Sequence, residues 1–211
     1  MYDLHIHSNF SDGKASIDEI AKRAKEIGLK AIAIVDHSSE HKLGLNERKA
    51  KAREVEIEKA RSKYDIEILS GVECGILPEG KILIPKFKFD IILIAVHEVL
   101  PKEEYYRRVK LCLTKNNVDV LSHFHSQMFC TLDGRDVERD VEILDMLKDG
   151  DVALELNSLH EAPPLDLVKK ASEIGVAYSI GSDSHSLQRV GDVEWCRKIA
   201  RKYFPNSKFI I

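Results

Sequence analysis

The chain has 211 residues, 44% hydrophobic and 32% charged, a composition typical of a folded domain rather than a disordered or fibrous protein. A single hydrophobic core serves chains of up to about 250–300 residues, so we expect one domain over residues 1–211. Thirty-two Lys and Arg against 35 Asp and Glu leave a net charge of −3. No global attraction to nucleic acid or to an anionic membrane is therefore expected.

Four widely separated cysteines include no Cys-x-x-Cys pair, so neither a zinc ribbon nor a redox motif is indicated. The longest apolar run, Ile91 to Val96, is far shorter than the about 20 residues that cross a bilayer. The N-terminus has neither the basic nor the apolar region of a signal peptide. We therefore expect a soluble, cytoplasmic protein with reduced thiols and no membrane partner. The sequence leaves the oligomeric state open.

Short apolar runs alternate with longer amphipathic segments along the chain. The runs predict seven strands, each rich in Ile, Val or Leu: Asp3 to His7, Ala31 to Val35, Glu67 to Val72, Asp90 to Val96, Val118 to Ser122, Val152 to Leu156 and Val176 to Ile180. The longer segments predict six helices: Ser16 to Ile27, Leu45 to Tyr64, Lys102 to Lys115, Asp136 to Lys148, Pro164 to Ile174 and Asp192 to Tyr203. Strand followed by helix, repeated, predicts a parallel α/β sheet or barrel.

Local signals mark several helix ends. Ser16 and Glu19 have the spacing of a capping box at the start of the first helix. Gly28, Gly150 and Gly175 each follow a predicted helix, where a left-handed residue commonly ends the hydrogen-bonded turns. We expect all three glycines to adopt that conformation.

Histidine and acidic side chains gather at the C-terminal ends of the predicted strands. They are His5, His7, His37, Glu73, His97, His123, Asp183 and His185. The loops at this edge of a barrel or open sheet converge over a rigid framework, so catalytic groups collect there. Without cations between them these side chains would repel or desolvate one another. The pattern predicts a multinuclear centre of Zn, Mn or Fe, since imidazole and carboxylate without thiolate suit these ions.

Each motif has a structural alternative when it is taken alone. His5 and His7 share one strand face, which suits one metal ion, but two core or surface histidines reach this spacing by chance. His37 could belong to a capped turn, and Glu73 could be a solvated acid at a strand end. The segment Gly181 to His185 could also form a capped turn. The joint pattern favours the metal centre.

Seven short segments, in order along the chain, carry these residues. They are DLHIHSNFSDG at Asp3 to Gly13, VDHS at Val35 to Ser38, GVE at Gly71 to Glu73, VH at Val96 to His97, SH at Ser122 to His123, ELN at Glu155 to Asn157 and GSDSH at Gly181 to His185. Together they resemble the motifs of the PHP (polymerase and histidinol phosphatase) superfamily. The resemblance implies a distorted (β/α)7 barrel, TIM-like, which agrees with the seven predicted strands.

The resemblance also implies a di- or trinuclear metal site. One metal would be held by His5, His7, Glu73 and Asp183. Glu73 would bridge to a second metal held by His97 and His123. A third would be held by Asp12, His37 and His185. Asp12 lies where several relatives supply a histidine, and Phe124 follows His123 where a proline is frequent. These two differences from the family pattern bear on the number of metals and on the substrate.

Such a centre predicts the hydrolysis of phosphate esters. Two metals about 3.5–4 Å apart lower the pKa of a bridging water and give a hydroxide in line with phosphorus, so no side-chain nucleophile is required. The residues expected to take part in catalysis are Glu73, Asp183 and His185. Four polar residues near the rim are candidates for substrate binding: His125, His160, Arg135 and Arg189. Each of these arginines also fits a solvated helix surface.

The main hypothesis is a metal-dependent phosphoesterase acting on a small phosphomonoester, histidinol phosphate included, or on a nucleotide. An alternative is a 3′-5′ exonuclease or DNA-end phosphatase, for which the run Tyr105-Tyr106-Arg107-Arg108 could stack bases and bind phosphates. The same run fits an amphipathic helix, and the acidic net charge does not favour nucleic acid. A non-catalytic alternative is a barrel subunit of a ribonucleoprotein or repair assembly, against which the intact ligand set argues.

Overall fold

The structure, a computed structural model, describes residues 1–205 and 208–210. The single domain predicted for residues 1–211 therefore includes positions 206, 207 and 211, which lie outside the described residues. Over the described part of the chain, no helix is both long and apolar enough to cross a membrane.

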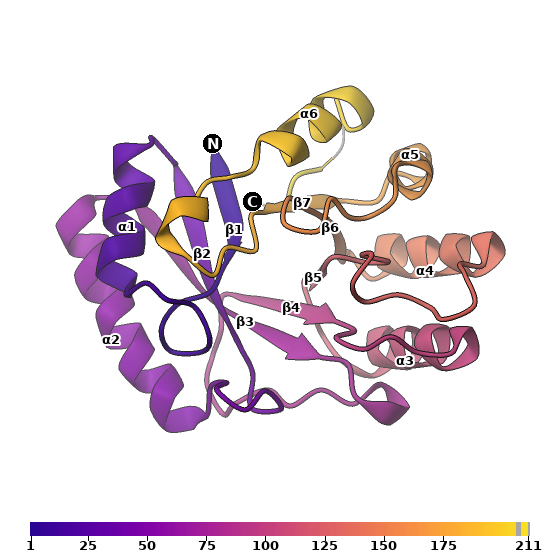
Figure 1. Ribbon diagram of the computed structural model, residues 1–211, viewed down its shortest axis with the longest axis horizontal. Helices are drawn as coiled ribbons and strands as arrows, with labels where there is room; N and C mark the ends of the chain where they lie inside the picture. Colours follow the sequence, from indigo (N-terminus) through magenta and orange to yellow (C-terminus); the bar gives the residue numbers. More distant parts are fainter. Residues whose placement is uncertain (206–207, 211) are drawn as a thin grey trace.

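Strands and helices alternate along the described residues (Figure 1). The seven strands are β1 (Tyr2–Ile6), β2 (Ala31–His37), β3 (Glu67–Gly75), β4 (Ile91–Ala95), β5 (Val120–Leu121), β6 (Ala153–Asn157) and β7 (Tyr178–Gly181). The six α-helices are α1 (Ile17–Glu26), α2 (Glu47–Tyr64), α3 (Lys102–Lys115), α4 (Val137–Asp149), α5 (Leu165–Ile174) and α6 (Glu194–Tyr203). Each corresponds to a predicted element. Two short 3₁₀ turns, η1 (Pro78–Gly80) and η2 (Leu187–Arg189), were not predicted.

The strands form one sheet in chain order, β1 to β7, and every neighbouring pair is parallel. A bridge between Ile6 and Ser184, with the His7 amide donating to the Ser184 carbonyl at 2.9 Å, joins the end of β1 to the segment after β7. The sheet is thus nearly closed. Figure 1 shows the helices around the outside of the strands, with α1 and α2 beside β1 to β3 and with α3 and α4 on the side of β4 and β5. The predicted (β/α)7 barrel is confirmed.

The helix ends confirm all but one of the predicted caps. The Ser16 side chain accepts from the Glu19 amide and the Glu19 carboxylate accepts from the Ser16 amide, completing the capping box. Gly28 and Gly175 have φ of 73° and 86°, in the left-handed region. The prediction for Gly150 is wrong, because its φ is −86° and α4 runs one residue further than expected. Asp151 takes the left-handed conformation instead, with φ of 54°; aspartate tolerates this region better than most residues.

Alternate residues of β2 and β3 point into the barrel. Ala33 and Val35, with Leu69 packed against them, belong to a hydrophobic cluster built from residues in or next to strands. Side chains two residues apart share a face of a strand, so His37 and Glu73 point the same way as these inner residues. The register pairs His37 directly with Glu73. The inner face of the barrel is therefore apolar below and carries polar ligands at its C-terminal end.

Strand β1 departs from regular pairing with β2 in the segment that contains His5. Its register with β2 shifts between Asp3 and Ile6. Such an irregularity re-aims the side chains of the strand. Leu4 belongs to the inner apolar cluster, and the next residue also reaches the interior, because His5 Nδ1 lies 2.6 Å from Glu155 Oε1 on β6. The shift thus places His5 next to the apolar cluster that fills the barrel interior.

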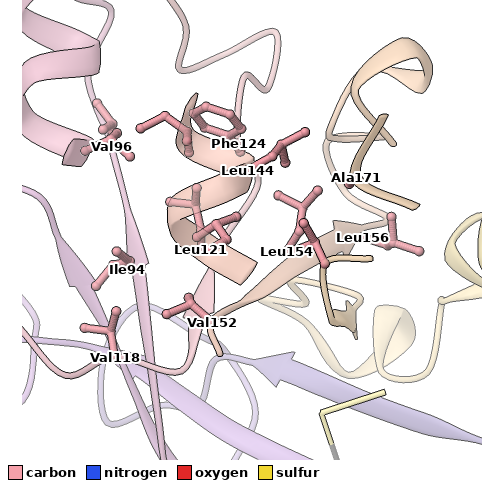
Figure 2. Close-up of a cluster of buried hydrophobic side chains, with 14 of the residues drawn as sticks. Ile94, Val96, Val118, Leu121, Phe124, Leu144, Val152, Leu154, Leu156 and Ala171 are labelled. Carbon is pink, nitrogen blue, oxygen red and sulfur yellow. The ribbon is translucent and has the colours of Figure 1, made fainter. Parts of the chain in front are cut away.

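A second layer of apolar side chains fills the space between the sheet and its outer helices. Figure 2 shows Phe124 beside Leu144 of α4, with Leu121 of β5 and Leu154 of β6 nearby; all four are buried. Full burial of a large apolar side chain contributes about 1.5–3 kcal/mol relative to exposure. Because Phe124 is held in this layer, the neighbouring His123 starts its loop from a fixed position.

Candidate metal centre

The structure brings all nine predicted metal ligands together at the C-terminal ends of the strands. These residues are His5, His7, Asp12, His37, Glu73, His97, His123, Asp183 and His185. Seven of them line one cavity of about 390 Å³. His5 and His7 are almost fully buried, at 0% and 1% exposure, and contact residues of the cavity lining. The predicted convergence of strand ends has therefore placed every candidate ligand at one site.

Three of these residues, His5, His7 and Asp183, form one group of metal-ligand type, with Glu73 beside them. His5 Nε2 and His7 Nε2 lie 3.0 Å apart, and His7 Nε2 lies 3.3 Å from Asp183 Oδ1. Glu73 approaches both rings, at 3.6 Å from His5 Nε2 and 3.7 Å from His7 Nε2. In a tetrahedral site with metal–ligand bonds of about 2.1 Å, ligand atoms lie about 3.4 Å apart. The spacing fits one divalent ion.

Glu73 stands between this group and the next. Its Oε1 lies 3.3 Å from His97 Nε2 and 3.1 Å from His123 Nε2. Its Oε2 lies 3.0 Å from His37 Nδ1 on the neighbouring strand. One carboxylate therefore contacts histidines that belong to different ligand groups, which is the geometry of a bridging ligand.

A third group forms nearer the solvent around Asp12, which comes from the loop after β1. Asp12 Oδ2 lies 3.6 Å from His37 Nε2 and 3.5 Å from His185 Nε2. His7 also takes part, since its Nδ1 lies 3.8 Å from Asp12 Oδ1. The ligand atoms of these four residues all lie within 4.8 Å of one another. Aspartate at this position is thus close enough to act with the two histidines.

His160 joins the cluster in a way that the sequence did not indicate. Predicted as a substrate-binding residue, it lies with its Nε2 3.4 Å from Asp183 Oδ2. Its ring nitrogen, a ring nitrogen of His123 and a carboxylate oxygen of Asp183 form a further group of metal-ligand type. His160 sits in the loop after β6, where no periodic pattern fixes the direction of a side chain. The structure places it among the ligands as well as in the cavity wall.

The charges in the cluster depend on one another. Burial alone would raise the pKa of Glu73, but the nearby His97 and His5 and the hydrogen bond from His123 outweigh burial and hold that pKa well below its usual value. Burial lowers the pKa of His7 to about 4, so this ring is neutral at pH 7, the form that binds metal. Burial also opposes a charge on His37, but the adjacent carboxylates of Asp12 and Glu73, which stabilise the protonated ring, prevail and raise its pKa to about 10.

A buried nitrogen tests whether these residues fit metal ions. His7 Nδ1 is buried and has no hydrogen-bond partner among the described residues. An unsatisfied buried polar atom costs about 1–3 kcal/mol, so such atoms need a partner. Imidazole nitrogens and carboxylate oxygens at these spacings are the ligand set of zinc, manganese and iron sites. The residues present therefore fit the predicted cofactor.

Glu155 holds the innermost histidine from outside the ligand group. Its Oε1 accepts from His5 Nδ1 at 2.6 Å, which leaves His5 Nε2 directed at the cluster. Its Oε2 accepts from the His123 amide at 2.9 Å and from the Asn157 side chain at 3.0 Å. Glu155 belongs to the ELN segment, Glu155 to Asn157, but the sequence did not predict a role for it. The carboxylate–imidazole arrangement explains its presence, because such a partner fixes the ring tautomer and orientation of a metal-binding histidine.

Glu155→Gln is expected to weaken metal binding by about 10–100-fold, because it removes the negative charge behind His5 while preserving shape. The affinity for Zn²⁺ or Mn²⁺ can be measured by competition with a chromogenic chelator. The matched control is Glu173→Gln, on the outer helix α5, for which no change is expected. Unchanged metal affinity in Glu155→Gln would remove Glu155 from the account of the site.

The other predicted substrate-binding residues do not reach this cavity. His125 is 5% exposed and its Nε2 donates to Asp140 Oδ1 at 2.8 Å, on the far side of its loop. Arg135 is paired with Asp140 and Asp166. Arg189 lines a neighbouring polar hollow and lies 3.1 Å from Asp192. These contacts direct the three side chains away from the ligand cluster.

Several residues of the cavity wall were not among the predicted site residues. They are His41, Met128, Phe129 and Leu159. The ring of His41 lies 4.6 Å from that of His37, measured between centroids. All four come from loops, so the strand pattern that revealed the ligands gave no signal for them. A histidine four residues after His37 was the one available hint.

A nearly closed parallel barrel with histidines and carboxylates at its C-terminal rim defines the class of barrel proteins that carry a metal-ligand site there. Within that class, the chain belongs to the PHP domain family, whose model matches residues 3–159. This confirms the resemblance seen in the motifs.

The similar proteins include both polymerase-associated and phosphatase members. The chain is 30% identical to the DNA polymerase/3′-5′ exonuclease PolX of Bacillus subtilis over 221 residues, 99% of this chain but only 38% of that protein. It is 30% identical to a protein of Thermotoga maritima named as a probable histidinol-phosphatase, over 90% of this chain and 87% of that protein. Among solved structures, the histidinol phosphate phosphatase of Lactococcus lactis, in complex with Zn, L-histidinol and phosphate, has a TM-score of 0.71. It is 22% identical and covers 96% of this chain and 93% of that one, which supports the fold.

Proposed function

We propose that this protein is a metal-dependent phosphoesterase that hydrolyses a small phosphomonoester or nucleotide. The observation that carries the proposal is the position of Glu73, whose carboxylate lies 3.0–3.7 Å from ring nitrogens of five histidines. A buried carboxylate so placed is suited to bridge two cations. The L. lactis structure, which holds Zn and phosphate on the same fold, supports this assignment.

The chain's residues divide into those that hold metal and those that face the substrate. We assign a first metal to His5, His7, Glu73 and Asp183, a second to Glu73, His97 and His123, and a third to Asp12, His37 and His185. Bound divalent ions at such a site supply an activated water and neutralise the charge that develops on the phosphoryl group. Glu73, which the first two ligand groups share, would hold both of their ions, and Asp183 would complete the first group. His185, with a side chain 35% exposed, borders the cavity where a phosphoryl oxygen would enter.

A 3′-5′ exonuclease or DNA-end phosphatase is the second candidate, favoured by the match to PolX along 99% of this chain. Two features of the described residues weigh against it. Tyr105 and Tyr106 are buried, at 2% and 1% exposure, so their rings are not free to stack on bases. Arg107 and Arg108 of the same run pair with glutamates. The run is the amphipathic helix α3. A purely structural barrel is disfavoured because no proposed metal ligand is missing.

Removal and return of metal tests the proposed function. After dialysis against a chelator, we expect no hydrolysis of phosphomonoesters, including histidinol phosphate and nucleotides, and recovery when Zn²⁺ or Mn²⁺ is added. Single-stranded DNA labelled at its 3′ end, assayed in parallel, distinguishes the second candidate. Faster turnover of DNA than of small esters would transfer the assignment to the exonuclease. Metal-independent hydrolysis, or none of any substrate after reconstitution, would contradict both.

A further inference from the structure

An apolar wall borders the ligand cluster on one side of the cavity. It is made of Met128 and Phe129, from the loop after β5, and Leu159, from the loop after β6. Met128 is 61% exposed and Leu159 39%, so large apolar side chains remain accessible beside a site built from charged groups. A ligand that covers this apolar surface removes it from water, which favours binding.

Phe129 connects this wall to the ligands themselves. Its ring centroid lies 5.4 Å from that of His97, 5.7 Å from that of His123 and 5.9 Å from that of His160. The wall therefore begins directly beside the proposed second metal. A phosphoryl group held at the cluster would place its ester substituent against Phe129 and, beyond it, Met128 and Leu159.

Apart from histidines, the rest of the cavity offers no cationic side chain for a second anionic group. Among the described residues its lining consists of histidines, the three carboxylates Asp12, Glu73 and Asp183, and the apolar wall; no lysine or arginine contributes. Arg189, in the adjoining hollow, is paired with Asp192. Metal ions at the cluster would neutralise one phosphate, but a further carboxylate or phosphate that the substrate placed against the apolar wall would lose hydration without compensation.

We propose that Met128, Phe129 and Leu159 form a leaving-group subsite, and that the substrate is a monophosphate ester of an alcohol carrying an uncharged apolar or aromatic group. This inference rests on the proposed function for the phosphoryl end of the substrate. The new part of the inference is the kind of leaving group that the apolar wall prefers. Esters with a polar leaving group, or with a second negative charge, are bound less well because they leave the wall uncovered or place charge against it.

The test compares three esters of primary alcohols, so that their leaving abilities are similar: benzyl phosphate, glycerol 3-phosphate and phosphoglycolate. With the metal-loaded protein, kcat/KM for benzyl phosphate is expected to exceed that for glycerol 3-phosphate by about 10-fold or more, with phosphoglycolate slowest. Leu159→Asn and Met128→Gln, which exchange apolar for polar groups of similar size, should each lower the benzyl-to-glycerol ratio by about 5–10-fold.

Leu132→Asn is the matched control, since Leu132 belongs to the same loop as Met128, is 68% exposed and lies outside the cavity lining. It should preserve the ratio.

Binding of benzylphosphonate, measured by calorimetry, gives a readout that needs no turnover, and Leu159→Asn should weaken it by a similar factor. Equal kcat/KM values for the three esters, or the same ratio in Leu159→Asn and Leu132→Asn, would overturn the subsite while the phosphoesterase stands. Selective benzylphosphonate binding without hydrolysis of any ester would retain the subsite and refute the proposed function.

Discussion

Glu73→Gln is expected to lower kcat/KM for phosphomonoester hydrolysis by at least about 10²–10³-fold with little loss of fold. The substitution keeps the shape of the side chain but removes the negative charge that lies between His5, His37, His97 and His123. A neutral amide cannot bridge two cations as a carboxylate does. Steady-state kinetics of the metal-reconstituted variant, with its metal content measured in parallel, would show the loss of activity together with the loss of bound metal.

The matched control is Glu67→Gln, an exposed glutamate at the opposite end of the same strand β3. It should retain full activity and full metal content. Far-UV circular dichroism of both variants confirms that the barrel persists. If Glu73→Gln hydrolyses phosphomonoesters at a rate near that of the unmodified protein, the bridging assignment is wrong.

Arg53→Met is expected to lower the free energy of unfolding by about 3–5 kcal/mol, because it leaves a buried carboxylate without its cation. Arg53 is fully buried in helix α2, and its Nη1 donates to Asp36 Oδ2 at 3.1 Å. Its Nη2 donates to the Gly71 carbonyl at 2.6 Å and to Ser70 Oγ at 3.1 Å. Asp36, in turn, lies next to His37. Urea unfolding of the metal-free protein measures the change without a contribution from bound ions.

Arg48→Met is the control for this change, because Arg48 lies on the same helix but is exposed. Its effect should stay within about 0.5 kcal/mol, as for most surface substitutions. A similar small effect of Arg53→Met would mean that Asp36 finds other compensation. Ser8 and Ser11, whose hydroxyls donate to Asp36 at 2.8 and 2.7 Å, would then be the groups to examine.

The fold, and the meeting of the candidate ligands at one rim, were predictable from sequence because both follow from simple periodicities. Short apolar runs marked the strands, and side chains two residues apart on a strand share one face. From that rule, His37 and Glu73, at the ends of apolar runs, were expected to point to one rim. The structure pairs them there. Parallel strands bring their C-terminal ends to one edge, so residues from distant segments could be expected to meet there.

Residues in loops escaped the same argument. His125 follows His123 by two positions, which in a strand would give both rings one direction. The chain has left the strand there, however, and His123 and His125 have φ of 29° and 55°. His125 turns instead to Asp140 on α4. His160 and the apolar wall reach the cavity for equally local reasons, through loop conformations that no repeating pattern encodes.

Helix ends were predictable only in part. Gly28 and Gly175 have the expected left-handed backbone, whereas Gly150 does not. A glycine after a helical pattern shows where the left-handed conformation costs little free energy. The next residue, Asp151, can adopt that conformation too. In the structure α4 continues to Asp149, so the left-handed residue falls one position beyond Gly150.

Elemental analysis of the purified, untagged protein is the most direct test of the central claim that the histidine and carboxylate cluster is a multinuclear metal site. The protein would be produced in metal-replete medium, dialysed against metal-free buffer and assayed for transition metals per chain. We predict two or three equivalents of Zn, Mn or Fe. No tightly bound metal, even after reconstitution, would contradict the claim and leave the cluster without its proposed role.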